Sequence, residues 1–329
     1  MTARLTTSTR VNNDVTVAEF VDLAQLAEAL GFDQIWVSND LFLRSAPVLI
    51  AAAAVATSRI AIGTCIVNPF SIHPAELAMT ATTLQELSGG RFLLGIAAGA
   101  EDFLSWAGIE QRRPLAVTRE AILAIRALTE GRSPVDVEGA GAGWTADARL
   151  RTPSHPTPIY LGAMSPRMLT MIGELADGGL PLLYPPESFV EAREYVDAGL
   201  ASSGRDRGAV DLAACIWVSI DEDRQRARQP LAEKLAYFAP SFSPYVLERA
   251  GIDASAVTAL RDIDMNRAGE LVPESLMTLG IAGTPDEVVE RCRGLVGLGV
   301  SHLSFGPPLG PDRKHAMRLL ADHVLPALC

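Results

Sequence analysis

The strongest constraint on the fold of this chain is a regular alternation of short β-branched segments with amphipathic segments of helical period. In the N-terminal third the order is β-α-β-α-β-α-β, at residues 4–9, 17–30, 34–37, 47–56, 60–67, 76–87 and 92–96. The connections are so short that each strand must lie beside the next, with a helix packed across the pair. This order predicts a parallel sheet that winds in one sense.

Local signals mark the ends of the first helix. Thr16 can cap it, and Glu19 follows three residues later, which is the spacing of a capping box. Apolar residues then recur at helical spacing, and Gly31 ends the helix. The segment from Ala27 to Asp33 is therefore expected to be a helix end that leads into a strand.

The same alternation continues through the rest of the chain. Further strands are expected at residues 159–161, 179–183, 210–219 and 302–305, and further helices at 114–129, 166–176, 187–202 and 312–325. Two segments interrupt the pattern, a loop excursion at residues 131–158 and a helical insertion at residues 221–275. Eight alternating strands predict an α/β fold, a (β/α)8 TIM barrel with insertion segments, as a single domain over residues 1–329. Ligands of such barrels bind where the strands end and the loops begin.

Charge and composition exclude several classes of protein. The net charge of −11 and the scattered basic residues argue against nucleic-acid binding, which needs a concentrated basic surface. The four cysteines lack the spacing of metal ligands or of a disulfide framework, so we expect no metal site. No signal peptide is apparent, and the most apolar stretch, residues 46–57, is too short to span a membrane. A cytoplasmic protein is expected.

Two loops after strands have the composition of ligand-binding segments. After the third strand, Asn68 and His73 each precede a proline, which indicates a constrained loop. An ordinary strand-to-helix corner is the alternative. After the fourth strand, Ala97, Ala98 and Gly99 have small side chains that would let a flat ring approach the backbone closely.

A third segment predicts an anion site. The strand at residues 159–161 leads directly into a helix whose first turn holds Pro166. The linking residues are Gly162, Ala163, Met164 and Ser165. Free backbone N–H groups at the helix start, with Ser165 as cap and hydroxyl donor, suit a cofactor phosphate. A plain capped helix is the alternative interpretation.

Together these segments resemble the bacterial-luciferase-like superfamily. The resemblance rests on Ala-Glu-x-x-Gly-Phe-Asp at residues 27–33, Leu-Ser-Gly-Gly-Arg at 87–91 and Gly-Ala-Met-Ser-Pro at 162–166, in this order. The stretches at residues 114–122, 173–178 and 306–312 are similar to the branch that uses the deazaflavin coenzyme F420, the methylenetetrahydromethanopterin reductase-like oxidoreductases. The resemblance covers residues 17–179 and the chain from Gly280 onward.

This resemblance implies a bound cofactor, coenzyme F420 or, as the alternative, FMN. It implies a non-prolyl cis peptide at Cys65–Ile66, behind the cofactor ring, and a phosphate held near Ala163. The residues that it implies for cofactor binding are Asn39, Cys65, Ile66, Asn68, Ala97, Ala98, Gly99, Gly162, Ala163, Met164 and Ser165.

Two acids are candidates for proton transfer, Asp40 and Glu101. The F420 branch often has Asp-His after its second strand, where this chain has Asn39 and Asp40, so the usual imidazole is missing. The usual acid of the branch after the fourth strand falls at Ala100, one residue before Glu101. A surface carboxylate is the alternative for either residue, and His73 is a weaker candidate that most often shapes its loop. Protonation by water or by the substrate itself also stays open.

The reaction expected from the resemblance is F420-dependent hydride transfer to or from a C=C, C=N or C–O centre of a small organic substrate. One alternative is an FMN-dependent luciferase-like monooxygenase, and another is a barrel that binds a cofactor without catalysis. The resemblance also implies a homodimer, formed through the helices beside the second and third strands. Residues 51–56, which are rich in alanine, suit close helix packing in a dimer or within the monomer.

Overall fold

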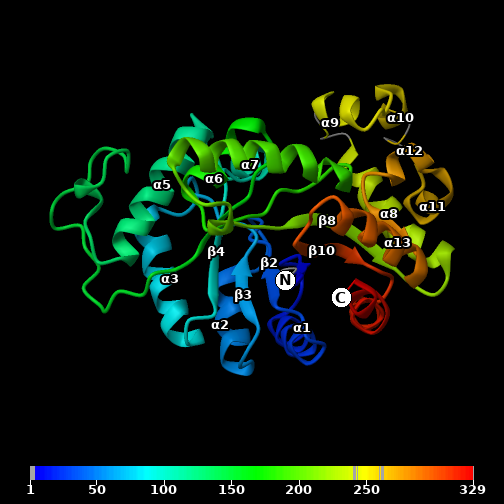
Figure 1. The fold of residues 1–329 in the computed structure, drawn as a ribbon, viewed down its shortest axis with the longest axis horizontal. Coiled ribbons are helices and arrows are strands. Elements are labelled where there is room, and N and C mark those ends of the chain that lie inside the picture. The colour runs from blue at the N-terminus through cyan, green and yellow to red at the C-terminus, as the bar shows by residue number, and fades with distance from the viewer. Residues whose placement is uncertain (1–3, 240–241, 243, 259, 261–262, 329) are drawn as a thin grey trace. The chain divides into compact units, whose positions relative to one another are not determined.

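The computed structural model describes residues 4–239, 242, 244–258, 260 and 263–328. Its elements are shown in Figure 1. The chain divides into two compact units, which we describe separately. One unit contains Thr9–Pro181 and Ala192–Ala213, and the other contains Met1–Ser8, Leu182–Glu191 and Ala214–Cys329. That the chain is a single domain stays a prediction.

Ten strands lie in the described part of the chain, and each recorded pair of them is parallel. They are β1 (Thr6–Val11), β2 (Gln34–Val37), β3 (Ala61–Thr64), β4 (Phe92–Ile96), β5 (Ile159–Leu161), β6 (Gly178–Gly179), β7 (Asp211–Leu212), β8 (Ala214–Ile220), β9 (Ile281–Gly283) and β10 (His302–Leu309). Hydrogen-bonded neighbours follow the order β7-β6-β5-β4-β3-β2-β1-β10-β8-β9. The predicted α/β class with a parallel sheet is therefore confirmed.

Helices connect these strands. The described helices are α1 (Val17–Ala29), α2 (Ala46–Ala56), α3 (Pro74–Ser88), α4 (Glu101–Trp106), α5 (Pro114–Thr129), α6 (Pro166–Leu175), α7 (Phe189–Ser203), α8 (Arg224–Phe238), α9 (Pro244–Arg249), α10 (Ala254–Thr258), α11 (Ala268–Leu271), α12 (Glu274–Met277), α13 (Pro285–Gly297) and α14 (Arg313–Leu319). The predicted capping box at the start of α1 is confirmed, because Thr16 and Glu19 bond each other's backbone N–H groups. In the described part of the chain, no helix combines the length and the apolar character that crossing a membrane requires.

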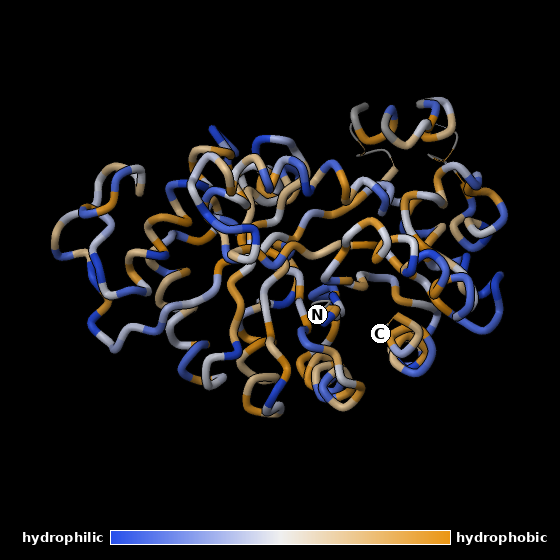
Figure 2. Tube along the Cα trace, viewed as in Figure 1, coloured by the Kyte–Doolittle hydropathy of each residue, from blue (hydrophilic) through white to orange (hydrophobic). Residues whose placement is uncertain are grey.

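The unit built on residues 9–181 holds strands β2 to β7 side by side, with α1, α2, α3 and α5 packed in sequence next to one another. Hydrophobic residues follow its strands, and hydropathy alternates along the helices around them (Figure 2). Trp36, on β2, is fully buried. A Cβ atom on Gly63 of β3 would lie 2.2 Å from the Trp36 ring, so this position requires glycine. The core of this unit is thus matched to one large aromatic side chain.

Two residues of the family-like motifs fasten the loop that leads into β3. Glu28, at the end of α1, accepts hydrogen bonds from the N–H groups of Arg59 (2.5 Å) and Ile60 (2.9 Å). Partial burial alone would raise the pKa of the Glu28 carboxyl, but these bonds and one from Ser58 outweigh it and lower the pKa to about 2. Arg91, at the start of β4, donates to the carbonyl of Ile60 (2.9 Å). Both side chains therefore organise backbone at the amino ends of the strands.

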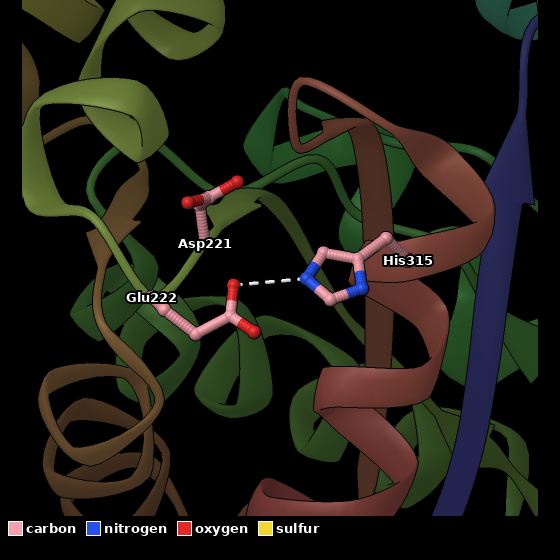
Figure 3. Close-up of side chains that lie close together, drawn as sticks. All are labelled: Asp221, Glu222 and His315. Carbon is pink, nitrogen blue, oxygen red and sulfur yellow. Dashed lines mark hydrogen bonds and ion pairs between the residues drawn. The ribbon is translucent and has the colours of Figure 1, made fainter.

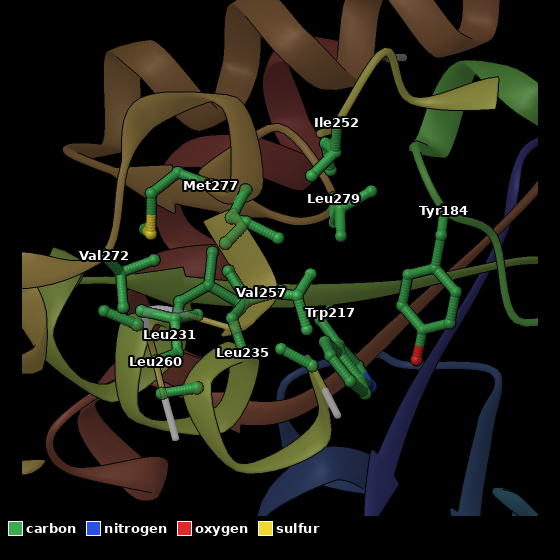
Figure 4. Packing of buried hydrophobic residues seen from close by; sticks show 14 of the residues in the cluster. Tyr184, Trp217, Leu231, Leu235, Ile252, Val257, Leu260, Val272, Met277 and Leu279 are labelled. Atoms are coloured by element: carbon green, nitrogen blue, oxygen red, sulfur yellow. The ribbon is translucent and has the colours of Figure 1, made fainter. Parts of the chain in front are cut away.

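The second unit has its own apolar core, in which α8 packs on β8. Figure 4 shows Trp217 of β8 beside Tyr184, with aliphatic residues of α8 and of the following helices around them. The rings of Tyr184 and Trp217 meet edge to face, with centroids 4.8 Å apart. The predicted insertion at residues 221–275 holds α8 to α11 and the start of α12, whereas residues 131–158 hold one 3-10 turn, Pro134–Asp136.

Several predicted boundaries were wrong. The expected strand at residues 179–183 is reduced to β6, and the strand at 210–219 is divided into β7 and β8 by Ala213. Neither β9 nor α4 was predicted, because each is too short to show a period. The last strand extends to Leu309, through a cis bond between Pro307 and Pro308. The described chain therefore has ten strands instead of the predicted eight.

Candidate functional site

The carboxyl ends of β2, β3, β4 and β5 carry every residue that the sequence assigns to the site. Because these strands are parallel neighbours, their carboxyl ends meet at one edge of the first unit. Asn39 and Asp40 follow β2, and Cys65, Ile66 and Asn68 follow β3. The residues after β4 and β5 are Ala97, Ala98, Gly99 and Glu101, and then Gly162, Ala163, Met164 and Ser165.

The ends of three strands converge on a surface of small side chains. The peptide bond between Cys65 and Ile66 is cis, which confirms the prediction. A Cβ atom on Gly162 would lie 3.1 Å from Cγ2 of Ile66 and 3.2 Å from Cβ of Ala97. These three residues are thus in close contact, and any side chain at position 162 would have to displace its neighbours. Gly162 and Ala97 add little side-chain volume here, and we call this group of three residues the floor of the site.

Asn68 is 4% exposed and organises the loop after β3. Its Oδ1 atom accepts hydrogen bonds from the N–H groups of Phe70 (3.1 Å) and Ser71 (2.9 Å). Its Nδ2 group has no hydrogen-bond partner among the described residues. The amide therefore has one occupied end and one end that can still donate to a ligand.

The turn after β4 is held by a residue that the sequence analysis missed. Gln111 donates from Nε2 to the carbonyls of Ala98 (2.8 Å) and Gly99 (3.1 Å). Gly99 has φ +83°, and a Cβ atom there would lie 3.1 Å from Cβ of Asn68. Glycine is thus required by the backbone conformation and by the neighbouring side chain.

The segment after β5 presents unbonded donors. The N–H groups of Ala163, Met164 and Ser165 have no acceptor among the described residues, and α6 begins directly after them. Ser165 occupies the N-cap position, but its side chain makes no capping hydrogen bond, so its predicted role as a side-chain cap was wrong. Backbone donors at a helix start are a suitable site for a phosphate oxygen.

The loop after β2 joins the candidate site to α2. Oδ1 of Asn39 accepts a hydrogen bond from the N–H of Ala46 (3.0 Å) and thereby caps α2, whose N-cap residue Ser45 makes no such bond. The Nδ2 group of Asn39 has no partner within the described part of the chain. Asp40 is half-buried, and its Oδ2 atom lies 3.2 Å from the Ser38 hydroxyl.

The other two candidate side chains are exposed. Glu101 is the first residue of α4, and its carboxylate makes no hydrogen bond or ion pair with a described residue. His73 accepts a hydrogen bond at Nδ1 from the N–H of Ala75 (3.2 Å) and lies against the Trp144 ring. His73 therefore caps α3, which agrees with the prediction that it shapes its loop.

Comparison with known proteins identifies the family of the chain. The family profile described as luciferase-like monooxygenase matches residues 2–302. The chain belongs to this family. The 5,10-methylenetetrahydromethanopterin reductase of Archaeoglobus fulgidus is 36% identical to it over 324 residues, which cover 96% of this chain and 97% of the relative. These findings confirm the resemblance on which the sequence analysis relied.

Two further relatives carry the cofactor in their names. The coenzyme F420 dependent tetrahydromethanopterin reductase of Methanopyrus kandleri has a solved structure that matches with a TM-score of 0.89 at 30% identity, covering 99% of this chain and 100% of that chain. An F420-dependent glucose-6-phosphate dehydrogenase of Nakamurella multipartita is 29% identical, covering 94% of this chain and 92% of the relative. The luciferase-like family members most similar to this chain thus include F420-dependent oxidoreductases.

An exposed aromatic group lies between two loops of this luciferase-like site. Phe42, after Asp40, is 68% exposed, and Trp106 of α4 is 65% exposed. Their ring centroids are 6.3 Å apart, and the Phe103 ring lies 5.0 Å from Trp106. No local pattern in the sequence indicates that these rings meet, since they follow different strands.

A buried polar network lies near the amino ends of the same strands. Tyr160 of β5 donates its hydroxyl to Oδ2 of Asp211 (2.8 Å), and Trp36 donates to Oε1 of Gln34 (3.0 Å). Nε2 of Gln34 lies 3.4 Å from the same Asp211 oxygen. Burial raises the pKa of the Tyr160 hydroxyl, and the negative charge of Asp211 raises it further. Tyr160 is therefore a neutral donor.

A charged group of the second unit is distinct from the luciferase-like site. The ligand-type atoms of Asp221, Glu222 and His315 lie within 4.8 Å of one another. Glu222 and His315 point toward each other and are joined at 2.8 Å (Figure 3). Asp221 accepts from the N–H of Asp223 (3.0 Å) and faces Arg226 (3.4 Å). These partners explain the group as an ion-pair cluster, and the absence of a metal stays a prediction.

Proposed function

We propose that this luciferase-like chain is an F420-dependent oxidoreductase that transfers a hydride between the deazaflavin and a C=C, C=N or C–O centre of a small organic substrate. The observation that carries the proposal is the meeting of Ile66, Ala97 and Gly162 beside the unbonded N–H groups that follow β5. Such an arrangement suits a flat ring with a phosphate-bearing arm. The identity of 36% with a methylenetetrahydromethanopterin reductase supports the same assignment.

Each group of residues has a role in this proposal. The N–H groups of Ala163, Met164 and Ser165 bind the phosphate, because backbone donors at a helix start attract anions. Cys65, Ile66 and the segment from Ala97 to Gly99 line the ring, and the small side chains of Ala97, Ala98 and Gly99 let it approach the backbone. Further donors to the cofactor are the Nδ2 groups of Asn39 and Asn68. When bound, the deazaflavin supplies or accepts the hydride.

Proton transfer is assigned to Asp40 first and to Glu101 second. Asp40 is half-buried, and by the family resemblance it occupies the place where the F420 branch often has histidine. Glu101 is exposed at the start of α4, so its carboxylate can reach substrate from the solvent side. The aromatic group of Phe42, Phe103 and Trp106 combines a ring from the loop that follows Asp40 with two rings of the helix that Glu101 begins, and it covers apolar parts of a substrate.

The finer architecture also belongs to the proposal. A closed (β/α)8 barrel is supported by the single residue, Ala213, that separates β7 from β8, since one continuous strand in this position would complete a ring of eight. A homodimer is supported by Val48 and Val55, which are 58% and 69% exposed on α2, and a cytoplasmic location stays a prediction.

The experiment is a comparison of two cofactors. Purified protein is titrated with F420 and with FMN, and binding is measured by fluorescence quenching. Turnover is then measured without oxygen, with reduced F420 and 5,10-methylenetetrahydromethanopterin, or with F420 and glucose 6-phosphate, the substrates named in the relatives. Tight F420 binding with turnover of either probe supports the proposal. Oxygen-dependent turnover with FMN would establish the monooxygenase alternative, and F420 binding without turnover would favour a non-catalytic barrel.

A further inference from the structure

Asn13 is a buried side chain outside the residues assigned above. It lies two residues after β1 and is 0% exposed. Its hydrogen bonds with the described residues all go to one segment, residues 38–44, which contains Asn39 and Asp40. A fully buried amide needs partners for its acceptor and for both of its donors, and here one loop supplies all of them.

The side chain bonds both sides of the Asp40 backbone. Oδ1 of Asn13 accepts from the N–H of Asp40 (3.3 Å), and Nδ2 donates to the carbonyl of Asp40 (3.0 Å). Both peptide groups that flank the Asp40 Cα atom are therefore tied to a single rigid amide. This arrangement limits rotation about the backbone bonds of Asp40 and so fixes the point and direction from which its side chain projects.

Further bonds hold the two ends of the loop. At its start, Ser38 donates its hydroxyl to Oδ1 of Asn13 (2.7 Å) and accepts from the backbone N–H of Asn13 (3.0 Å). At its end, the carbonyl of Arg44 accepts from Nδ2 of Asn13 (2.7 Å), and the Arg44 N–H donates to the Asn13 carbonyl (3.2 Å). The loop between these ends projects Phe42, which has φ +68°. Its base is fixed while its tip is exposed.

We infer that Asn13 is the positioning residue for Asp40, acting through the backbone of residues 38–44. This inference rests on the proposed function, in which Asp40 is the group that transfers the proton. Asparagine suits the position because one end of its amide accepts and the other donates twice. Aspartate would keep the acceptor but would set a carboxylate against the carbonyls of Asp40 and Arg44.

The first test needs no substrate. Amide hydrogen exchange is measured for wild type, Asn13→Ala, the near-isosteric Asn13→Asp and the control Asn12→Ala. Asn12 is half-buried and makes no hydrogen bond with a described residue. We expect the amides of Asp40 and Arg44 to exchange at least tenfold faster in both Asn13 variants, with an unchanged rate in the control. Unchanged exchange in folded Asn13→Asp would overturn the inference, whatever the enzyme does.

The second test is a double-mutant cycle between Asn13→Ala and Asp40→Asn. F420 affinity is measured by fluorescence quenching, and kcat and KM are measured with whichever of the two probe substrates is turned over. If Asn13 acts through Asp40, each single variant lowers kcat at least tenfold, and the double variant is no slower than Asp40→Asn. The Kd for F420 stays within threefold of wild type.

The outcomes of this cycle separate the two hypotheses. Additive losses of kcat, or a loss of F420 affinity in Asn13→Ala that equals its loss of activity, would reduce Asn13 to general support of the fold. A wild-type protein that does not bind F420 would refute the proposed function. The exchange experiment would still decide whether Asn13 holds the loop.

Discussion

The two ends of strands β2 to β7 differ in how far their polar groups are hydrogen-bonded. At the amino ends, Gln34, Tyr160 and Asp211 satisfy one another in a buried network. At the carboxyl ends, the N–H groups of residues 163–165 and the Nδ2 groups of Asn39 and Asn68 have no acceptor among the described residues. Unpaired polar groups lower stability, so donors left without an acceptor at the carboxyl ends are suited to bonding a ligand. The proposed function thus predicts that stability and cofactor binding depend on different ends of the same strands.

The largest effect is expected at the carboxyl end, from Gly162→Val. A Cβ atom at this position already lies 3.1 Å from Ile66, so two further methyl groups must displace the floor of the site. We expect the Kd for F420 to rise about 100-fold, equivalent to about 2.7 kcal/mol of overpacking. Gly208→Ala is the control, because nothing lies within 4 Å of its added Cβ atom. Equal affinity of Gly162→Val and wild type would show that the floor is not part of the site.

At the amino end, Tyr160→Phe should lower stability and leave cofactor binding unchanged. Loss of the 2.8 Å hydrogen bond from the buried Tyr160 hydroxyl to the half-buried Asp211 carboxylate is expected to cost about 2 kcal/mol in urea unfolding at pH 7.

The stability difference between wild type and Tyr160→Phe should decrease as the pH rises. The pKa of Tyr160 is raised in the folded state, by burial first and by Asp211 second, so the unfolded hydroxyl ionises more readily. The stabilising contribution of Tyr160 is complete below the unfolded pKa of about 10 and is lost as the pH rises above it. Wild type and Tyr160→Phe should therefore converge in stability at alkaline pH. A difference that grows above pH 10 would contradict this account.

Cysteine alkylation gives a smaller effect that separates the two ends without mutation. Cys65 is half-buried at the carboxyl end of β3, whereas Cys215 and Cys292 are buried, and burial raises the pKa of Cys292 to about 12. Cys65 should react first among these three thiols. At an F420 concentration ten times Kd, mass action predicts about tenfold slower labelling of Cys65, followed by peptide mass spectrometry. An unchanged rate of Cys65 labelling in the presence of F420 would show that the cofactor does not bind over Cys65. Cys329 lies outside the described residues.

The smallest effect is expected from Glu28→Gln, at the amino end of β3. The amide should lower the free energy of unfolding by about 1 kcal/mol at pH 7, because it replaces a carboxylate that accepts three backbone N–H groups.

The contribution of Glu28 to stability should decrease as the pH is lowered. The folded pKa of Glu28 is lowered to about 2, so its contribution is complete above the unfolded pKa of about 4.5 and is lost as the pH falls through 2. Wild type and Glu28→Gln should therefore approach each other in stability in acid. A change in F420 affinity with this substitution would contradict the prediction that the amino ends affect stability and not cofactor binding.

Hydrophobic period and local caps were enough to predict the parallel α/β architecture, including the capping box of Thr16 and Glu19. The cis bond at Cys65 followed from family resemblance and not from any local pattern. The hydrogen bonds of Asn13 and Gln111 were missed because their partners are distant in sequence, as in the bond from Asn13 to Ser38 across 25 residues. Short elements such as β9 are stabilised by tertiary pairing, which sequence period does not reveal.

The hydrogen bonds that hold the loop before β3 give a structural reason for two of the family motifs. Glu28 and Arg91 belong to two of the three motifs that resemble the family, and both bond backbone at the amino ends of the strands, whereas Asp40 follows the carboxyl end of β2. These two motifs therefore record how the architecture is anchored and carry no information on what the protein converts. Substrate choice can diverge at the opposite rim while the anchoring signature stays the same.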